Sequence, residues 1–425
     1  MLYRDEIKRL AKVQGREFRI ALVGAGQMGR GFASQTHRMG ISVAVIADID
    51  PARIQQAYAD LRLGEAVISD DVDTLNKAIE SGKPAGTSNA ELIAHLNVDV
   101  VVEATGVPEI GAKVAYNSLV NKKHVAVLNV ECDVTIGPIL RKTAENNGVI
   151  YSVCHGDEPV EAKELVDFAL DLSFEVVCAG KGKNNPFEPL SNPDTVSERA
   201  KAKHMNPKML ASFTDGSKTM IEMAALANAT GLKLTQRGMI GPAATVKTLQ
   251  DVFALKADGG VLDEPGVVEY CTGDVAPGVF VVVRTDSPYV AEEMSYLSMG
   301  KGPYFTIYRP HHLASVEAPL TIAKILVDGR TSLVSGTRMT EVIAATKKVH
   351  KSGEKFDGIG GFSARGVTDK VADALKDNLV PIGILQGATA KRDIPVGAYV
   401  SYDDVELDTN QTIYQLRKQQ DALGL

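Results

Sequence analysis

The sequence predicts an α/β protein in three parts: a parallel sheet wound with helices, an inserted α+β domain and a small β-rich C-terminal module. A strand, a glycine-rich turn and a helix follow one another over residues 18–39. Short apolar strands then alternate with helices up to about residue 155. After about Gly353 the pattern changes to glycine-rich loops and short strands, which is typical of a β module.

The first turn carries a dinucleotide-binding pattern. Gly24, Gly26 and Gly29 follow the apolar strand over residues 18–23 and open a helix over residues 27–39. The first glycine permits a tight turn, the second lets the backbone approach a pyrophosphate, and the third packs the helix on the strand. Because strand, turn and helix occur together, we predict a Rossmann-type domain.

The helix and the following strand supply further cofactor contacts. The amides of Gln27 and Met28, in the first helical turn, are free to bind the phosphates. Asp48 ends the apolar strand over residues 41–47, where an acid accepts hydrogen bonds from the adenosine ribose. Such an acid favours NAD because it repels the 2′-phosphate of NADP, whereas Arg53 partly reverses that preference.

Two later strands are expected to end beside the cofactor. The apolar strand over residues 98–103 leads into Thr105 and Gly106, and the strand over residues 124–130 closes on Asn129. Ligands of open parallel sheets bind in the crevice outside the carboxyl ends of the strands. These three residues are therefore predicted to contact the dinucleotide.

Composition excludes several classes of protein. The chain has 425 residues and a net charge of -7, which argues against nucleic acid as a partner. No apolar run has the length of a membrane span, and the N-terminal residues carry charges where a signal peptide is apolar. We therefore expect a cytoplasmic protein without a membrane partner.

A lysine-rich segment follows the strand predicted over residues 174–179. Lys181, Lys183 and Asn185 lie among glycines in the predicted loop over residues 180–186. Cations, backbone amides and a neutral donor suit a phosphate or a carboxylate. A solvated basic loop is the alternative, but the position directly after an apolar strand favours a ligand site.

A mostly apolar helix over residues 214–229 carries three charges. Asp215, Lys218 and Glu222 are spaced at i, i+3 and i+7 and therefore share one helix face. Charges in an otherwise buried helix are costly unless they are paired. The three residues are thus either an internal salt bridge or the edge of an active site.

These motifs carry a resemblance to known families. The first 330 or so residues resemble homoserine dehydrogenase-like oxidoreductases, and the tail resembles the SAF module. Together with the segments at 180–185, 205–207 and 215–222, the chain looks most like the deoxyxylulose-phosphate reductoisomerase-like family. This resemblance implies a dinucleotide-binding domain over 1–155 with a returning helix near 311–330, a substrate domain over 156–310 and a SAF-like β domain over 350–425.

The resemblance also implies a two-stage reaction. A divalent metal or a cationic site polarises a hydroxyketone, the carbon skeleton rearranges, and NADPH reduces the resulting aldehyde, with NADH as the alternative cofactor. Lys181, Lys183 and Asn185 would then hold the phosphate and the other substrate oxygens. The substrate is expected to be a small molecule, either a sugar phosphate or a hydroxy acid.

The remaining roles implied by the resemblance concern protons and metal. Lys218 would act as the acid or electrostatic stabiliser at the carbonyl, oriented by Asp215 and Glu222. Asp157 and Glu158 are the metal candidates, because hard divalent cations prefer oxygen ligands. The Asp-Ser-Glu metal signature of ordinary reductoisomerases is absent from the sequence, so the sequence leaves a metal requirement open.

Two alternatives stay open at this point. One is a dehydrogenase of homoserine or a sugar acid, which needs a positioned cation and a hydride but no rearrangement. The other is a non-catalytic protein that binds a nucleotide or a sugar. A homo-oligomer is the usual expectation for soluble dehydrogenases of this type.

Overall fold

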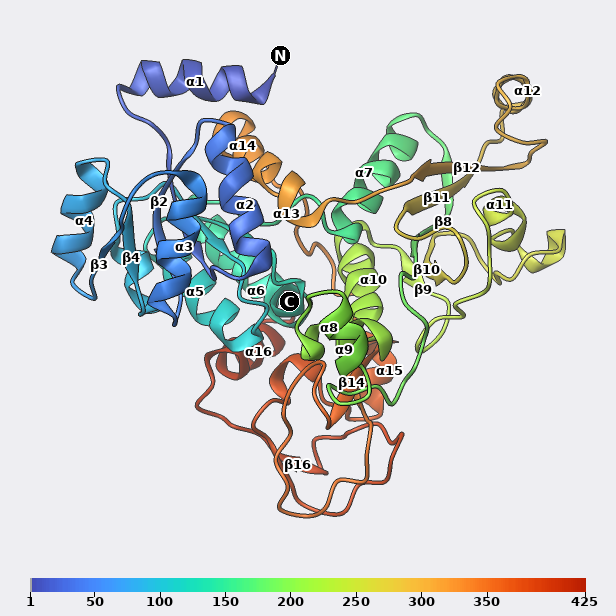
Figure 1. Cartoon of the computed structure of the whole chain (residues 1–425). Coiled ribbons are helices and arrows are strands. Elements are labelled where there is room, and N and C mark those ends of the chain that lie inside the picture. The colour runs from blue at the N-terminus through green and yellow to red at the C-terminus, as the bar shows by residue number, and fades with distance from the viewer. Residues whose placement is uncertain (1) are drawn as a thin grey trace. The chain divides into compact units, whose positions relative to one another are not determined.

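The computed structural model describes residues 2–425, which form two compact units (Figure 1). The first unit comprises the chain up to Asp157 together with Leu313–Ser335 and Gln411–Leu425. The second unit comprises Glu158–His312 and Gly336–Asn410. This division differs from the three expected domains, because the C-terminal β module belongs to the second unit and the last helix belongs to the first.

The first unit is built on a seven-stranded sheet whose strands all run parallel in the order β3-β4-β2-β1-β5-β6-β7. This arrangement confirms the predicted α/β fold. Its central strands are mostly apolar because helices cover both faces of a sheet of this kind. The strands are β1 (Arg19–Val23), β2 (Ser42–Ala47), β3 (Val67–Ile68), β4 (Ala85–Thr87), β5 (Val100–Glu103), β6 (His124–Val127) and β7 (Tyr151–Val153).

Helices connect these strands, and side-chain caps fix where several of them begin. Asp50 and Asp71 each accept a backbone amide in the first turn of the helix that follows, which satisfies a donor left free at the helix start. The helices are α1 (Tyr3–Gln14), α2 (Gln27–Arg38), α3 (Pro51–Leu61), α4 (Val72–Glu80), η1 (Ala90–His95), α5 (Pro108–Val120), α6 (Val130–Asn147), α13 (Ala314–Glu317), α14 (Pro319–Asp328) and α16 (Thr412–Ala422).

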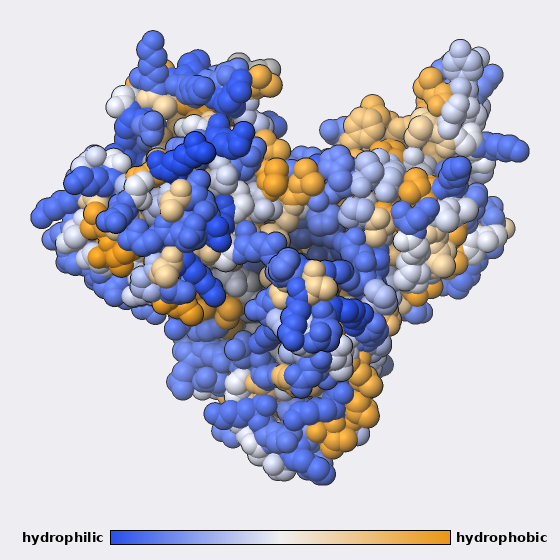
Figure 2. Space-filling model, viewed as in Figure 1, coloured by the Kyte–Doolittle hydropathy of each residue, from blue (hydrophilic) through white to orange (hydrophobic). Residues whose placement is uncertain are grey.

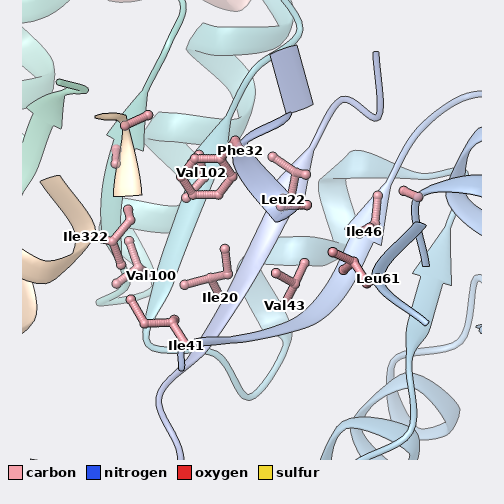
Figure 3. Packing of buried hydrophobic residues seen from close by; sticks show 14 of the residues in the cluster. Ile20, Leu22, Phe32, Ile41, Val43, Ile46, Leu61, Val100, Val102 and Ile322 are labelled. Carbon is pink, nitrogen blue, oxygen red and sulfur yellow. The ribbon is translucent and has the colours of Figure 1, made fainter. Parts of the chain in front are cut away.

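The returning helix packs on the core of this sheet. Figure 3 shows Ile322 of α14 close to the strand residue Val100, in the same cluster as Ile20 and Phe32. All four side chains are fully buried. Burying such side chains stabilises the fold by roughly 1.5–3 kcal/mol each. Helix α14 lies within the segment near 311–330 where the sequence analysis expects a returning helix.

The last helix also belongs to the first unit. Glu109, in the first turn of α5, accepts the backbone amides of Thr412 and Ile413 at 3.0 and 2.9 Å. These amides open α16 and have no partner within the helix, so the carboxylate caps it and opposes its dipole. The chain therefore ends in a helix, whereas the sequence predicted only short strands and turns there.

The second unit contains a mixed five-stranded sheet in the order β12-β11-β8-β10-β9. Helices α7 (Glu158–Asp171) and α10 (Ser217–Thr230) pack against it and against each other. The lysine-rich strand β8 pairs in parallel with β10 and antiparallel with β11. The strands are β8 (Glu175–Gly182), β9 (Lys233–Leu234), β10 (Val267–Cys271), β11 (Val279–Arg284) and β12 (Tyr304–Arg309).

The C-terminal part of the second unit forms small antiparallel sheets, as the sequence predicts. Strand β13 (Thr340–Thr346) pairs with β14 (Ala364–Lys370), and β15 (Thr389–Ala390) pairs with β16 (Val405–Glu406). Both β13 and β14 lie beside α10. The remaining helices of this unit are α8 (Ser197–Ala202), α9 (Pro207–Thr214), α11 (Leu249–Val252), η2 (Lys256–Asp258), α12 (Pro288–Tyr296), α15 (Val371–Lys376) and η3 (Ile382–Ile384).

The visible surface is mostly hydrophilic, with small separate apolar patches (Figure 2). Among residues 2–425, no helix has both the length and the apolar character that a bilayer crossing requires. The four cysteines, Cys132, Cys154, Cys178 and Cys271, are buried free thiols.

Candidate active site

The glycine turn of the first unit has the geometry that a dinucleotide requires. Gly24 has a φ of +100°, and a Cβ there would lie only 2.9 Å from the carbonyl oxygen of Ala104. A Cβ on Gly29 would overlap the carbonyl oxygen of Gly24, so the helix and the turn touch through backbone alone. A Cβ on Gly26, by contrast, would meet no atom within 4 Å. The open side of the turn is thus at Gly26, where a pyrophosphate would approach.

Helix α2 begins directly after this turn. Gly26 is its N-cap, and Gln27 and Met28 form its first turn with one side chain exposed and the other half-buried. The amides at a helix start are aimed along the axis and carry a partial positive charge. These residues therefore stand where the sequence predicts phosphate contacts.

Asp48 follows β2 and lies next to the glycine turn. Its Oδ2 accepts the amide of Ala25 at 2.7 Å, and its Oδ1 accepts the amide of Asp50 at 3.0 Å. Arg53 is exposed and pairs with Asp50 at 3.6 Å. The half-buried carboxylate of Asp48 thus stands at the end of β2, as a ribose-binding acid does.

The loop after β5 is organised by a buried acid. Glu103 accepts hydrogen bonds from the amide and the hydroxyl of Thr105 with one carboxylate oxygen, and its other oxygen finds no hydrogen-bond partner among residues 2–425. Burial raises the pKa of Glu103 to about 7. Gly106 follows with a φ of +66°. The loop that carries Thr105 and Gly106 is therefore held by a carboxyl group that favours its protonated form.

Asn129 shapes the same loop from the neighbouring strand. Its side chain is buried, accepts the amide of Cys132 at 3.1 Å and donates to the carbonyl oxygen of Val107 at 3.1 Å. It caps α6 and fixes the loop after β5. A direct contact between Asn129 and the cofactor stays a prediction.

In the second unit, Lys181 lies between two buried carboxylates. Its Nζ donates to Glu158 Oε1 at 2.6 Å and also to Glu222 Oε2. Lys181 comes from β8, Glu158 from the start of α7, and Glu222 from α10. His312 Nε2 lies 3.1 Å from Glu158 Oε1. We refer to Lys181, Glu158, Glu222 and His312 as the Lys181 cluster.

The lysine-rich segment is a strand for most of its length, because β8 continues to Gly182. A Cβ on Gly180 would overlap the carbonyl oxygen of Glu269, and one on Gly182 would overlap the amide nitrogen of Ala276. The two glycines therefore let neighbouring backbone pack closely around Lys181. The predicted loop over residues 180–186 is wrong at its start, where these glycines are fixed in the sheet.

The other two predicted members of that segment, Lys183 and Asn185, have different surroundings. Lys183 is 7% exposed and donates to the carbonyl oxygen of Phe213 at 2.7 Å, whereas Asn185 is half-buried in the following loop. Burial and the charge of Lys181 lower the pKa of Lys183 to about 8. Burial also lowers the pKa of Lys181, but the charges of Glu158 and Glu222 outweigh it and keep that pKa above its ordinary value.

The charges around α10 divide into two groups. Lys218 Nζ lies 3.9 Å from Glu222 Oε1, so the predicted neighbourhood of these two residues is confirmed. Asp215 precedes the helix, which begins at Ser217, and accepts the amide of Ser217 and the ammonium of Lys347 at 2.8 and 2.9 Å. The expected arrangement of Asp215 on one helix face with Lys218 is therefore wrong, because the helix starts after it.

The donor set suits a hard cation. Carboxylate oxygens of Glu158 and Glu222 lie within 4.8 Å of one another, and oxygen ligands are those that divalent cations prefer. Asp157, the other metal candidate, directly precedes Glu158 in the chain and ends the first unit. Glu158 and Glu222 are thus the described residues of the second unit that would hold a metal.

Three residues escaped the sequence reasoning. Lys347 pairs with Asp215, which lies 132 residues earlier in the chain. His312 Nε2 lies near Glu158, although the two residues stand at opposite ends of the segment Glu158–His312. Neither partner is visible in a local pattern. Glu103 did leave a signal, because a charged residue closing a buried apolar strand is costly and needs a reason.

Two family profiles match adjacent parts of the chain. Residues 24–153 match the family described as "Homoserine dehydrogenase, NAD binding domain". Residues 156–318 match the family described as "Oxidoreductase DRL, catalytic domain". No curated protein matches the chain.

Solved structures with a similar chain trace are dehydrogenases and oxidoreductases. A probable dehydrogenase from Thermotoga maritima is 15% identical, with 74% of this chain and 90% of that chain covered at a TM-score of 0.42. A scyllo-inositol dehydrogenase from Lactobacillus casei, solved with NAD(H) and scyllo-inositol, is 12% identical, with coverages of 74% and 91% and a TM-score of 0.40. A DOX-P reductoisomerase solved with fosmidomycin and magnesium is 15% identical, with coverages of 48% and 56% and a TM-score of 0.34.

The glycine turn and the two profiles agree on the class of the protein. The chain is an NAD(P)-dependent oxidoreductase with a dinucleotide-binding domain of the homoserine dehydrogenase type. The match to an oxidoreductase catalytic domain over 156–318 favours an enzyme over the non-catalytic alternative.

Proposed function

We propose that this oxidoreductase is a reductoisomerase that rearranges and reduces 1-deoxy-D-xylulose 5-phosphate in the synthesis of isoprenoid precursors. The observation that carries the proposal is the Lys181 ammonium held by two buried carboxylates within the segment that matches an oxidoreductase catalytic domain. A fixed cation in a buried site stabilises the negative charge that develops on a substrate oxygen during rearrangement and reduction.

The residues of the second unit divide the work. Lys181 stays protonated because of Glu158 and Glu222, so it acts as an electrostatic stabiliser and not as a base. Lys218 is partly exposed beside Glu222 and is the proposed proton donor at the carbonyl. Lys183 holds the anionic end of the substrate, and Asn185 contributes a neutral donor to the other oxygens.

A divalent metal fits the same carboxylates. Glu158 and Glu222 would hold it, and when bound it would supply Lewis-acid polarisation of the substrate oxygens. Lys181 Nζ already bonds both carboxylates, so a metal held there would share them with this ammonium.

The proposed hydride donor is NADPH, as in the family that the sequence resembles. NADH is the alternative, and Asp48 is the observation that favours it, since its carboxylate stands where a 2′-phosphate would be repelled. Exposed Arg53 is the cation in this region that would bind the 2′-phosphate.

A dehydrogenase that acts on a sugar acid or on homoserine without rearrangement is the second candidate. The Lys181 cluster supports it as well, because a positioned cation and a hydride suffice for that reaction. The two candidates differ in whether the carbon skeleton of the substrate changes.

A panel of substrates separates the candidates. The purified chain is mixed either with 1-deoxy-D-xylulose 5-phosphate and NADPH or NADH, or with homoserine or a sugar acid and NADP⁺ or NAD⁺, each with and without Mg²⁺. Oxidation of the reduced cofactor or reduction of the oxidised one is followed at 340 nm. We expect oxidation of NADPH with the deoxyxylulose phosphate. No turnover of that substrate under any of these conditions, together with turnover of a sugar acid or homoserine, would contradict the proposal.

A further inference from the structure

Two cations approach one aromatic ring in the second unit. Lys183 Nζ lies 6.0 Å from the centroid of the Phe187 ring, and Arg365 Cζ lies 5.6 Å from it. Lys183 follows β8, whereas Arg365 lies on β14 of the C-terminal β module. The ring is 40% exposed, so both cations lie beside a ring that is partly open to solvent.

Neither cation has a carboxylate partner within ion-pair distance in the described part of the chain. Lys183 donates to the carbonyl oxygen of Phe213, which is uncharged. The acid whose charge acts on both cations is Asp215. Its carboxylate is already neutralised by Lys347 at 2.9 Å.

Such an arrangement is costly without a ligand. Lys183 is nearly buried and Arg365 is half-buried, and burial lowers the pKa of each. Buried charges in native proteins are normally paired. Two cations without an ion-pair partner beside one partly exposed ring therefore favour a site for an anion.

The start of α10 adds a third positive element. A Cβ on its N-cap, Gly216, would lie 2.6 Å from the Phe187 ring, so the helix start touches the ring. The Ser217 hydroxyl accepts the amide of Gly366 at 2.8 Å, which holds β14 and therefore the adjacent Arg365 beside the helix start. The N-terminus of a helix carries about half a positive charge.

We propose that Lys183, Arg365 and the start of α10 form the binding site for the phosphate dianion of the substrate, beside the Phe187 ring. The assignment rests on the proposed function for the identity of the substrate. Two cations and a helix start match the charge of a phosphate dianion better than that of a single carboxylate. The C-terminal β module thereby supplies half of the phosphate site.

Direct binding of inorganic phosphate tests this site without turnover. The full chain is first saturated with the reduced cofactor that binds it more tightly, so that the glycine turn is filled, and phosphate is then titrated by calorimetry. We expect Arg365→Gln to weaken phosphate binding about tenfold or more, because a hydrogen bond to a charged group contributes about 1.5–3 kcal/mol. Arg392→Gln is the matched control, since Arg392 lies in the same module but is exposed and paired with Asp404.

The outcomes are distinct. Weaker phosphate binding by Arg365→Gln with an unchanged control supports the site. If Arg365→Gln fails to fold, Arg365→Lys, which keeps the charge but loses the guanidinium, should bind phosphate more weakly than the wild type. No phosphate binding by the wild type, or equal binding by wild type and both Arg365 variants, overturns it. Tighter binding of malonate than of phosphate overturns the phosphate assignment in favour of a carboxylate.

The same titration separates this inference from the proposed reaction. If phosphate binding depends on Arg365 while 1-deoxy-D-xylulose 5-phosphate is not turned over, the reaction fails and the phosphate site stands. If the substrate is turned over but Arg365 makes no difference to phosphate binding, the site fails and the reaction stands.

Discussion

Glu103 in the first unit and Lys181 in the second both lie near the end of a buried strand, yet their surroundings are opposite. Glu103 has neutral donors on one oxygen and no hydrogen-bond partner among residues 2–425 on the other, and burial raises its pKa to about 7. Lys181 lies between two carboxylates and keeps its charge. The buried acid of the first unit is thus held by neutral hydrogen bonds, whereas the buried lysine of the second unit is held by paired charge.

The largest effect is expected when the paired charge of the second unit is broken. Lys181→Met removes the ammonium that bonds both buried carboxylates, Glu158 and Glu222, so the free energy of unfolding should fall by about 3–5 kcal/mol. Urea denaturation followed by circular dichroism measures this change. Lys351→Met, at an exposed ion pair with Asp393, is the control and should change it by less than about 1 kcal/mol.

A double variant sharpens this test. Adding Glu222→Gln to Lys181→Met removes one of the two repelling carboxylates and should recover part of the lost stability. If Lys181→Met is as stable as the wild type, the charge pairing described for the second unit is refuted.

The next effect concerns the unpaired acid of the first unit. The folded state raises the pKa of Glu103 from 4.5 to about 7, so it binds a proton more tightly than the unfolded chain does. Stability from this group is therefore full below about pH 4.5 and declines as the pH rises through 7, by on the order of 3 kcal/mol. Glu103→Gln should be more stable than the wild type at pH 8, and nearly equal to it at pH 4.5.

Urea denaturation at pH 4.5, 6 and 8 measures this difference. Glu91→Gln, at an exposed glutamate of the same unit, is the matched control and should follow the wild type at each pH. If the free energies of unfolding of the wild type and of Glu103→Gln differ by the same amount at all three pH values, Glu103 does not titrate in this range.

Two glycines of the cofactor turn should respond differently to the same substitution. Gly29→Ala would overlap the Gly24 carbonyl oxygen and should cost roughly 1–3 kcal/mol of stability. Gly26→Ala meets no atom of the chain and should leave the melting temperature unchanged, while it weakens cofactor binding by about tenfold or more. Thermal melting measures the stability of each variant, and a cofactor fluorescence titration measures its affinity for the cofactor. Equal cofactor affinity in Gly26→Ala and wild type would refute the assignment of this turn to the pyrophosphate.

The smallest expected effect is a change of cofactor preference. Asp48→Asn removes the charge that repels a 2′-phosphate, while the asparagine oxygen can still accept the hydrogen bond from the Ala25 amide. The Kd for NADPH should therefore fall about tenfold relative to the Kd for NADH. Asp50→Asn, two residues on, is the control. An unchanged ratio of the two dissociation constants would show that Asp48 does not face the adenosine ribose.

The sequence predicted the cofactor unit more fully than the substrate unit, and the reason lies in chain distance. Gly24, Gly26, Gly29 and Asp48 act within one strand-turn-helix-strand segment, so their spacing alone indicates their roles. Lys347 lies 132 residues from its partner Asp215. No periodicity relates residues so far apart.

Local rules also failed where tertiary pairing overrode them. Glycine and lysine are disfavoured in strands, so the segment after Ala179 was expected to be a loop. Strand β8 nevertheless continues to Gly182, because β10 and β11 pair with it on both sides. In the same way, Asp215 was expected inside a helix, whereas it ends α9 and bonds the first amide of α10.

The central claim is that the Lys181 cluster carries out the chemistry of an NAD(P)H-dependent rearrangement. The most direct test is conversion of 1-deoxy-D-xylulose 5-phosphate by wild type and by Lys181→Met, with the carbon skeleton of the product identified by ¹³C NMR. We predict a rearranged, reduced product from the wild type and a rate about 100- to 1,000-fold lower from the variant. An unrearranged product, or equal rates with and without the Lys181 ammonium, would contradict this account.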